Sequence, residues 1–322
     1  MTTPAEDARQ DRRFRRISAF ASLMPRKVAR VFSYFRTRWV LMTGDFAKVR
    51  EILASNLEPV VPDVAERRAA VERLLRNYGM FLTDYFRIPA MKAAWMPKMF
   101  RPLVGQEHVA AALKAGKGAI LVTPHLGNWE LGGIAMLLLG MPVTGVAVPD
   151  PLNPAITRFR DNARRIHGME VLNIEPGMMT PIALARALGQ NRLVAMLADR
   201  NFFETDPVEV DYFGRKAYFP RGPGLLSLAT DAPVLPAFVT MGTGGKYDAE
   251  VLPPVPAPAE GDKRTRAGAM VQALAKIFEQ RIRAHPDQWY VFDPFWGGAE
   301  PVSNLARAAA GIAGGRPVSP LK

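Results

Sequence analysis

The sequence predicts an α/β fold in which a central, largely parallel β-sheet is flanked by helices. Between residues 106 and 251, short apolar runs alternate with longer stretches whose apolar residues recur every three or four positions. Strands that alternate with helices at this spacing form parallel sheets covered by helices. The chain is also large enough to bury a substantial core, because it has 322 residues, of which 48% are hydrophobic.

The elements of the alternation can be placed in order. The expected strands cover 118–123, 143–148, 169–173, 192–197 and 234–239, and a further strand ends near residue 251. The expected helices cover 106–115, 129–139, 153–167, 179–189 and 222–230. Ligands of such sheets bind beyond the carboxyl ends of the strands. His125 and Asp199 each follow a strand end, so both are candidate site residues.

Two longer helices lie outside the alternation. One covers 62–87, where apolar residues recur at three- and four-residue steps, and the other runs from about 265 to 284 after a proline-rich surface loop. The segment 89–102 carries methionine, tryptophan and phenylalanine among prolines. Such a segment usually belongs to the core or to a loop, and the alternative is that it lines a lipid-facing groove.

We expect three parts: a basic membrane-associating helical arm at 1–58, a catalytic domain at 59–300 and a flexible tail at 301–322. Residues 1–50 hold twelve Lys or Arg against four Asp or Glu, and so carry most of the net charge of +12. Apolar side chains are interleaved with these arginines, as in basic helices that lie in the headgroup layer of an anionic membrane. A solvated tail is the alternative. Nucleic-acid binding is not expected, because no zinc finger, RNA-stacking signature or basic zipper accompanies the charge.

Composition excludes several classes of protein. There is no cysteine, which rules out disulfide scaffolds, thiolate metal sites and cysteine nucleophiles. The four histidines stand singly, so we expect no zinc site. No apolar run reaches about 18 residues, and the charged N-terminal segment lacks the apolar region of a signal peptide. We therefore expect a cytoplasmic protein whose membrane contact is peripheral.

The most informative motif is His125-Leu-Gly-Asn-Trp-Glu130, which follows the strand at 118–123. Asn128 is a candidate N-cap, which would place Glu130 in the first helical turn. A histidine held by a carboxylate can take a proton from a hydroxyl, because the carboxylate stabilises the imidazolium that forms. No serine or cysteine nucleophile stands beside it, so activation of a substrate hydroxyl is the simplest use. A structural core histidine is the alternative.

Three further segments are candidates. Asp199 ends an apolar strand, with a turn residue or helix cap as its alternative role. In the segment that begins at Tyr212, Gly222 and Gly224 open a helix whose backbone N–H groups could face an anion or a phosphopantetheine arm, and ordinary loop geometry is the alternative. The aromatic cluster at 285–296 is best explained by packing.

Taken in order, these segments resemble the lysophospholipid acyltransferase superfamily. The similar branch holds the late acyltransferases of lipid A biosynthesis and the actinobacterial phosphatidylinositol mannoside acyltransferases. The resemblance covers about residues 60–297. It is carried by Gly116-Lys-Gly118, His125-Leu-Gly-Asn-Trp-Glu130, Ala198-Asp-Arg200, Phe213-Gly214 through Pro220-Arg-Gly-Pro223, Ala232-Pro-Val-Leu-Pro236 and Pro286-Asp-Gln-Trp289.

The resemblance implies a glycerolipid acyltransferase-like fold and an O-acyltransferase. Such an enzyme moves a fatty acyl group from acyl carrier protein or coenzyme A to a hydroxyl of a membrane lipid, such as a lipid A precursor. It acts at the cytoplasmic face of the bacterial inner membrane and requires no cofactor beyond the acyl thioester. Aspartate in the dyad and a Phe-Pro-Glu-Gly-Thr block, both usual in glycerolipid acyltransferases, are missing, which speaks against simple lysophosphatidic acid acylation. The hydrophobic anchor helix of many lipid A enzymes is also missing.

By position, the resemblance makes His125 the general base and Glu130 its carboxylate partner. An arginine some thirty residues further on would hold the oxyanion or a phosphate. The candidates are Arg158, Arg160, Arg164 and Arg165, of which Arg164 is favoured. Asp199 would position the acceptor. The expected substrate-binding residues are Asn128, Trp129, Arg165, Arg200, Arg221 and Gly222.

The expected chemistry is direct transfer. His125 takes the proton of the acceptor hydroxyl while Glu130 holds the other ring nitrogen, and the oxygen attacks the thioester. Backbone N–H groups near Gly127 and Asn128, or Arg164, would stabilise the oxyanion. Two alternatives remain: a lipid hydrolase or thioesterase in which water replaces the hydroxyl, and a non-catalytic membrane-binding or nucleic-acid-binding protein.

Overall fold

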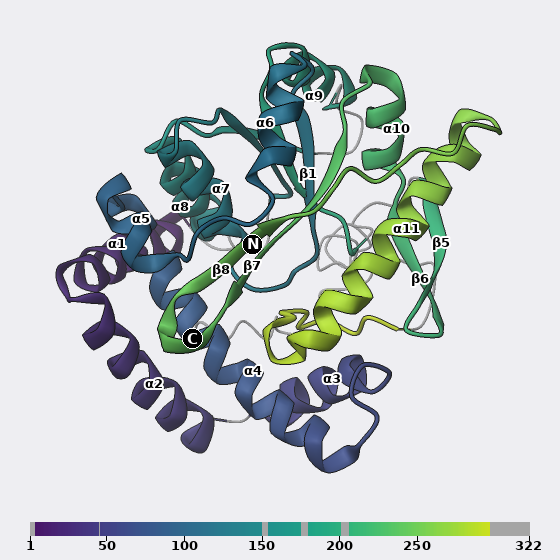
Figure 1. Ribbon diagram of the computed structural model, residues 1–322. Coiled ribbons are helices and arrows are strands. Elements are labelled where there is room, and N and C mark those ends of the chain that lie inside the picture. The colour runs from purple at the N-terminus through teal and green to yellow at the C-terminus, as the bar shows by residue number, and fades with distance from the viewer. Residues whose placement is uncertain (1–3, 45, 150–153, 175–179, 201–205, 297–322) are drawn as a thin grey trace.

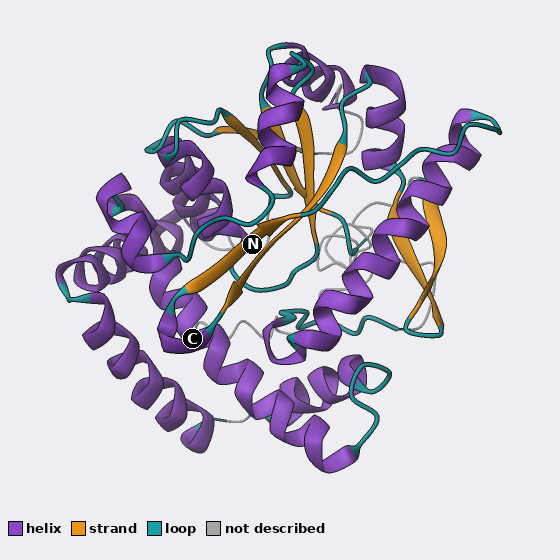
Figure 2. Ribbon diagram, in the orientation of Figure 1, coloured by secondary structure: helices purple, strands orange, loops and turns teal. Residues whose placement is uncertain are grey.

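The fold is built around a six-stranded sheet with strand order β3-β2-β4-β1-β7-β8. The computed structural model describes residues 4–44, 46–149, 154–174, 180–200 and 206–296. The strands are β1 (Ala119–Thr123), β2 (Val143–Ala147), β3 (Glu170–Asn173), β4 (Leu193–Leu197), β7 (Val234–Met241) and β8 (Tyr247–Val251). All neighbouring strands are parallel except β7 and β8. The predicted α/β class with a largely parallel sheet is confirmed (Figures 1 and 2).

Helices cover both faces of this sheet. They are α6 (Gln106–Lys114), α7 (Trp129–Leu138), α8 (Pro154–Arg165), α9 (Thr180–Gly189), α10 (Gly222–Thr230) and α11 (Lys263–Ala284), within two residues of the predicted ends. From β1 to β3 the chain crosses the sheet in one direction, through α7 and α8. From β3 to β7 it crosses in the opposite direction, through α9 and α10. Right-handed crossovers in opposite directions place helices on opposite faces. Figure 1 shows α7 and α8 on one side of the sheet and α10 on the other.

The N-terminal residues are helical, as predicted for the basic arm. The helices are α1 (Pro4–Leu23), α2 (Arg26–Thr43) and α3 (Ala47–Leu57), followed by the long α4 (Val64–Tyr85). Helices α2 and α3 pack on α4, and α1 packs on α8 (Figure 1). Buried side chains of α1 and α3, such as Phe14 and Leu53, belong to the same hydrophobic core as the sheet. The boundary at 58 stays a prediction, and the tail at 301–322 lies outside the described residues.

Helix α2 meets α4 through its small side chains. Ala29 and Ser33 are buried, and the Ser33 hydroxyl donates to the Gly79 carbonyl at 2.8 Å. A Cβ atom at Gly79 would overlap the hydroxyl of Thr37, so the glycine permits this close approach of the helices. Most of the large apolar side chains of α2, among them Phe32, Phe35 and Trp39, are exposed. Among the described residues, no helix is long and apolar enough to cross a membrane.

The segment 86–104 connects α4 to α6 by short helical turns. These are η1 (Ile88–Ala90), η2 (Ala93–Trp95) and α5 (Met96–Met99). Met91, Met96 and Met99 are buried. The core interpretation therefore holds for the methionines, and some of the segment also lines a cavity described below.

One hairpin was not predicted. Strands β5 (Pro207–Tyr212) and β6 (Arg215–Pro220) pair antiparallel and pack on α11. Val208, Val210 and Tyr212 alternate toward the core. The turn is Phe213-Gly214, with φ of 53° and 74°, which is the left-handed conformation that two-residue hairpin turns require. Phenylalanine at the first of these positions gives no turn signal, and no element was predicted for this segment from the sequence.

Candidate active site

The carboxyl edge of the sheet brings His125 and Asp199 together. In the neighbouring parallel strands β1 and β4, Thr123 pairs with Leu197. His125 and Asp199 each lie two positions beyond this pair. The strand register therefore sets two side chains that are 74 residues apart in sequence next to one another.

Asp199 holds His125 at two points. Its Oδ1 lies 2.6 Å from Nδ1 of the imidazole, and its Oδ2 accepts the backbone N–H of His125 at 2.9 Å. The indole Nε1 of Trp289 donates to the same Oδ2 at 3.1 Å. Asp199 is fully buried, at 0% exposure. Burial alone would raise the pKa of Asp199, but His125 and the donors outweigh burial and lower that pKa, so the carboxylate is ionised.

This contact fixes the role of each ring nitrogen. A carboxylate at Nδ1 favours the tautomer that carries its proton there, which leaves Nε2 as the proton acceptor. The imidazole side chain is 13% exposed, so it lies at the boundary between the core and the site. The Trp129 ring stands edge-on to it, with ring centroids 5.4 Å apart. The pair has the arrangement of a general base and its orienting acid.

Glu130 is not the carboxylate that holds the imidazole, which corrects the predicted pairing. Its two oxygens accept from Arg164 instead, Oε2 from Nε at 3.0 Å and Oε1 from Nη2 at 2.6 Å. Burial would raise the pKa of Glu130, but Arg164 outweighs it and the pKa is lowered. Gly127, at φ 65°, and the cap residue Asn128 turn the chain between His125 and α7, so Glu130 faces α8. A part for Glu130 in catalysis stays a prediction.

The loop after His125 is held by its own backbone. The N–H of Gly127 donates to the Gln288 carbonyl at 2.9 Å, and the N–H of Asn128 donates to the Val239 carbonyl at 2.7 Å. Both amides are therefore occupied in this structure, and stabilisation of the oxyanion by backbone N–H groups near them stays a prediction. Asn128 is the N-cap of α7, as predicted, since its Oδ1 accepts from Leu131 N–H at 3.2 Å.

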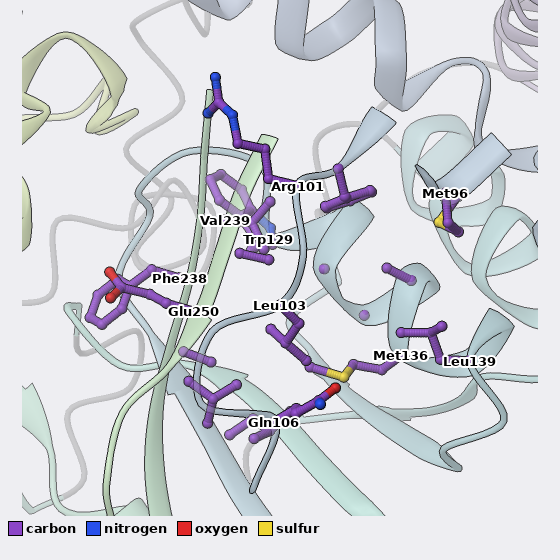
Figure 3. Close-up of a pocket in the computed structure, with 18 of the residues that line it drawn as sticks. Met96, Arg101, Leu103, Gln106, Trp129, Met136, Leu139, Phe238, Val239 and Glu250 are labelled. Carbon is purple, nitrogen blue, oxygen red and sulfur yellow. The ribbon is translucent and has the colours of Figure 1, made fainter. Parts of the chain in front are cut away.

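An apolar cavity of about 510 Å³ lies between α7 and the sheet. His125 is not among the described residues that line it, but Thr123, two positions earlier in the chain, and Trp129, which packs against the imidazole, both line it. Further from the site it is lined by Leu121, Ala195 and Met136. Figure 3 shows Leu103, Met136 and Trp129 gathered in the space between α7 and the strands. The lining is mostly apolar, which is typical of a site for a small hydrophobic ligand.

The comparison with known proteins decides the family. The model of the bacterial lipid A biosynthesis acyltransferases matches residues 17–297. The chain belongs to this family. It is therefore an acyltransferase, and the resemblance noted in the motifs is confirmed.

Several relatives support this assignment. A phosphatidylinositol mannoside acyltransferase of Mycobacterium tuberculosis (strain CDC 1551 / Oshkosh) is 35% identical over 252 residues, which cover 76% of this chain and 77% of that protein. The protein of the same name from Mycolicibacterium smegmatis is 28% identical over 277 residues, 85% of this chain and 86% of its own. A lipid A biosynthesis acyltransferase of Haemophilus influenzae is 28% identical over 189 residues, 58% of this chain and 56% of its own.

Of the four candidate arginines in this family member, Arg164 is the one that binds Glu130. It is buried, whereas Arg165 is exposed. Arg158 pairs with Asp7 and Asp11 of α1, and Arg160 donates to the carbonyl of Val148 at 2.9 Å. The contacts of Arg164 are therefore structural in this state, and contact with an oxyanion or a phosphate stays a prediction.

The other expected site residues are engaged elsewhere or lie apart. Asp199 is fully buried and binds His125, so its expected help in positioning the acceptor would act through His125 and stays a prediction. Arg200 pairs with Asp293 at 2.9 Å. Arg221 pairs with Asp206 at 3.1 Å and donates to the Arg264 carbonyl at 2.8 Å, so it joins the hairpin to α11. Substrate contacts of Arg165, Arg200, Arg221 and Gly222 stay predictions.

Two functional relationships were not predicted. Trp289 donates to Asp199, although its segment was interpreted as packing. Tyr247 lies at the centre of a buried polar chain behind α7: its hydroxyl donates to Asp84 at 2.9 Å and accepts from the Asn128 amide at 3.2 Å. Asp84 also pairs with Arg26 and with a second arginine of α2. A tryptophan and a tyrosine near a sheet edge give no sequence signal for such bonds.

Proposed function

We propose that this acyltransferase moves a fatty acyl group from an acyl thioester to a hydroxyl of a membrane glycolipid or phospholipid. The donor would be acyl carrier protein or coenzyme A, used as a co-substrate, with no metal or bound cofactor needed. The observation that carries the proposal is the pairing of His125 with Asp199, together with the contact of the His125 ring with Trp129, which lines an apolar cavity. A base for a hydroxyl and a space for an acyl chain are the two features that this reaction requires.

A glycolipid is the first acceptor to test. The two mycobacterial relatives named phosphatidylinositol mannoside acyltransferases match 76% and 85% of this chain, against 58% for the lipid A biosynthesis acyltransferase. We therefore infer a phosphatidylinositol mannoside as the leading candidate and a lipid A precursor as the second. Both carry sugar hydroxyls above a lipid, which fits a base that lies beside an apolar cavity.

The proposed reaction uses His125 twice. Nε2 removes the proton as the acceptor oxygen attacks the thioester carbonyl, while Asp199 stabilises the imidazolium at Nδ1. The new C–O bond forms in a tetrahedral intermediate, which collapses as the C–S bond breaks. The imidazolium then returns its proton to the leaving thiolate. The acyl chain would lie in the cavity, with its carbonyl near Trp129.

The decisive experiment measures acyl transfer by the purified protein. Acyl thioester and vesicles with the acceptor lipid are supplied, and the products are identified by mass spectrometry. Replacing His125 by Ala should lower the rate about 10²–10⁴-fold with the fold retained. Asp199→Asn should also lower it, because asparagine cannot stabilise the imidazolium. The matched control is His108→Ala on α6, which should keep wild-type activity.

The same experiment separates the rival functions. Free fatty acid in place of acylated lipid would identify a hydrolase or thioesterase. Equal transfer by wild type and His125→Ala would show that the imidazole is structural and would overturn the proposal.

We also propose that the outer side of α1 and α2 binds an anionic membrane surface, with the enzyme peripheral at the cytoplasmic face of a bacterial inner membrane. Large apolar side chains are exposed there: Phe20, Leu23, Val28, Val31, Phe32, Phe35, Trp39 and Met42. Lys27, Arg36 and Arg38 are exposed beside them. Apolar side chains that enter the headgroup layer, flanked by cations that meet anionic lipid, are the chemistry of interfacial helices.

Vesicle sedimentation tests this surface. Replacing Phe35 and Trp39, which are 62% and 65% exposed, by Ser should weaken binding to vesicles that contain phosphatidylglycerol. The control is Ile182→Ser on α9, because Ile182 is equally exposed, at 60%, on another helix. Equal binding by all variants, or equal binding to neutral phosphatidylcholine vesicles, would contradict the assignment.

A further inference from the structure

Residues 286–290 form a short strap across the loop that carries His125. The strap begins with η4 (Pro286–Gln288) and continues through Trp289 and Tyr290. The N–H of Tyr290 donates to the His125 carbonyl at 2.8 Å, and the Gln288 carbonyl accepts the N–H of Gly127 at 2.9 Å. Leu126 and Trp289 face one another in this antiparallel bridge. The strap therefore holds the backbone on both sides of Leu126, directly after His125.

The strap is itself fixed to the sheet. The Gln288 side chain accepts the N–H of Met241 at 2.7 Å and donates to the Met241 carbonyl at 3.0 Å, at the end of β7. These two bonds use the backbone N–H and carbonyl of Met241, as a neighbouring strand would, and they hold Gln288 in place. Trp289 follows directly, so its indole points from a fixed backbone toward the carboxyl ends of the strands.

We propose that Trp289 is a positioning residue of the acyl-transfer reaction, acting through Asp199 by means of its indole N–H. The inference rests on the proposed function of His125 as the base. Oδ2 of Asp199 accepts from both the His125 backbone and Nε1 of Trp289, which leaves Oδ1 aimed at the imidazole. Without the indole donor, the fully buried carboxylate keeps its two bonds to His125 and loses the bond that comes from the strap.

Packing alone does not account for this arrangement. The Trp289 ring is buried against Phe295, with centroids 4.9 Å apart, and a phenylalanine could fill much of that space. A buried indole N–H does need an acceptor, but a backbone carbonyl is sufficient. Trp296 in the same cluster shows this, since its Nε1 donates to the Asn56 carbonyl at 3.0 Å. Trp289 instead donates to the acid that orients the base.

The other titratable groups around Asp199 are neutral or already paired. The phenol of Tyr212, on β5, is buried, and burial raises its pKa well above the ordinary value, so it stays neutral. Arg200 pairs with Asp293, and Glu130 pairs with Arg164. The indole N–H is therefore the donor from the strap that stabilises the ionised form of Asp199.

The test compares Trp289→Phe with Trp296→Phe. Both changes remove an indole N–H from one aromatic cluster, but only the first removes a bond to Asp199. Loss of that bond makes the buried carboxylate and its imidazole bind a proton more tightly. The acid limb of the kcat/KM profile, which reports protonation of the pair, should move about one pH unit to higher pH in Trp289→Phe. Trp296→Phe should keep the wild-type limb.

A second measurement does not depend on acyl transfer. The five indole N–H signals of the protein are recorded by ¹H–¹⁵N NMR, and the Trp289 signal is assigned by its loss in Trp289→Phe. In Asp199→Asn this signal should move more than the Trp296 signal. An unshifted acid limb in a folded Trp289→Phe, or an unmoved Trp289 signal in Asp199→Asn, would overturn the inference. Failure of the proposed function is distinct, since wild-type protein would then show no transfer at all.

Discussion

Glu130 and Arg164 form a two-point ion pair that joins the first turn of α7 to the last turn of α8. Both side chains are buried. Asp161, one turn earlier in α8, lies 3.7 Å from Arg164. Because α7 begins just after the loop of His125, this pair anchors the helix on which Trp129 faces the base. Glu130 thus supports the site by fixing the position of α7.

The ion pair should be strongly coupled in stability. Replacing Arg164 by Met leaves a buried carboxylate without its partner, and the loss should be about 3–5 kcal/mol. Adding Glu130→Gln to Arg164→Met should recover part of that loss, as measured by urea unfolding. Arg158→Met serves as the control, because Arg158 makes only exposed ion pairs, which contribute little. Additive effects of the two buried substitutions would contradict the coupling.

Stability should fall in acid partly through Glu130. Its pKa in the folded protein lies below the ordinary value of 4.5, so its contribution is complete above about pH 4.5 and is lost as pH falls through the lowered pKa. In Glu130→Gln, the unfolding free energy should fall less steeply in this range, by up to about 1.4 kcal/mol per pH unit. Urea unfolding at a series of acid pH values measures the slope. Identical slopes in the variant and the wild type would show that Glu130 does not titrate in this way.

The depth of the cavity should set the length of the acyl chain. Ala195 lines the cavity and pairs with Leu121, so it lies two positions further from His125 along the strands than Thr123 does. Ala195→Leu should shift the preferred acyl thioester to a shorter chain, with rates measured over a series of saturated thioesters. Ala185→Leu on α9 is the matched control, because Ala185 does not line the cavity. An unchanged chain-length profile in Ala195→Leu would place the chain elsewhere.

The contact between α2 and α4 should depend on the size of residue 79. Gly79→Ala would favour α4 by about 1 kcal/mol from helix propensity alone. We expect net destabilisation instead, because the new methyl group overlaps the Thr37 hydroxyl. Adding Thr37→Ala should restore much of the loss in thermal or urea unfolding. Stabilisation by Gly79→Ala alone would show that the helices are further apart.

Much of the fold follows from local patterns in the sequence. The buried strands are continuous apolar runs, and turn residues mark their ends, so β1 and α7 were predicted within one residue. Hairpin β5–β6 was missed because Phe213 adopts a positive φ that its side chain does not favour. The packing of Tyr212 on the aromatic cluster, through contacts distant in sequence, supports that turn.

The site was predicted in its members but not in its pairings. His125 and Asp199 could each be recognised at a strand end, but strand order is a tertiary property and the sequence does not display it. Proximity in sequence favoured Glu130 as the partner of His125. A glycine and an N-cap between them reverse the chain direction, and the partner comes instead from the neighbouring strand.

The polar chain from α2 to Asn128 has a consequence for shortened forms of this enzyme. Asp84 is fully buried, and burial would raise its pKa, but Arg26 and Arg30 outweigh burial and lower it. A fragment that starts at α3 would still contain the residues of the sheet, the cavity lining and the base. It would also leave the buried Asp84 carboxylate without its two arginine partners. This carboxylate accepts a hydrogen bond from Tyr247, which in turn binds Asn128, the N-cap of α7. Enzyme engineers who trim the first two helices to improve yield would therefore undermine the catalytic loop from a distance.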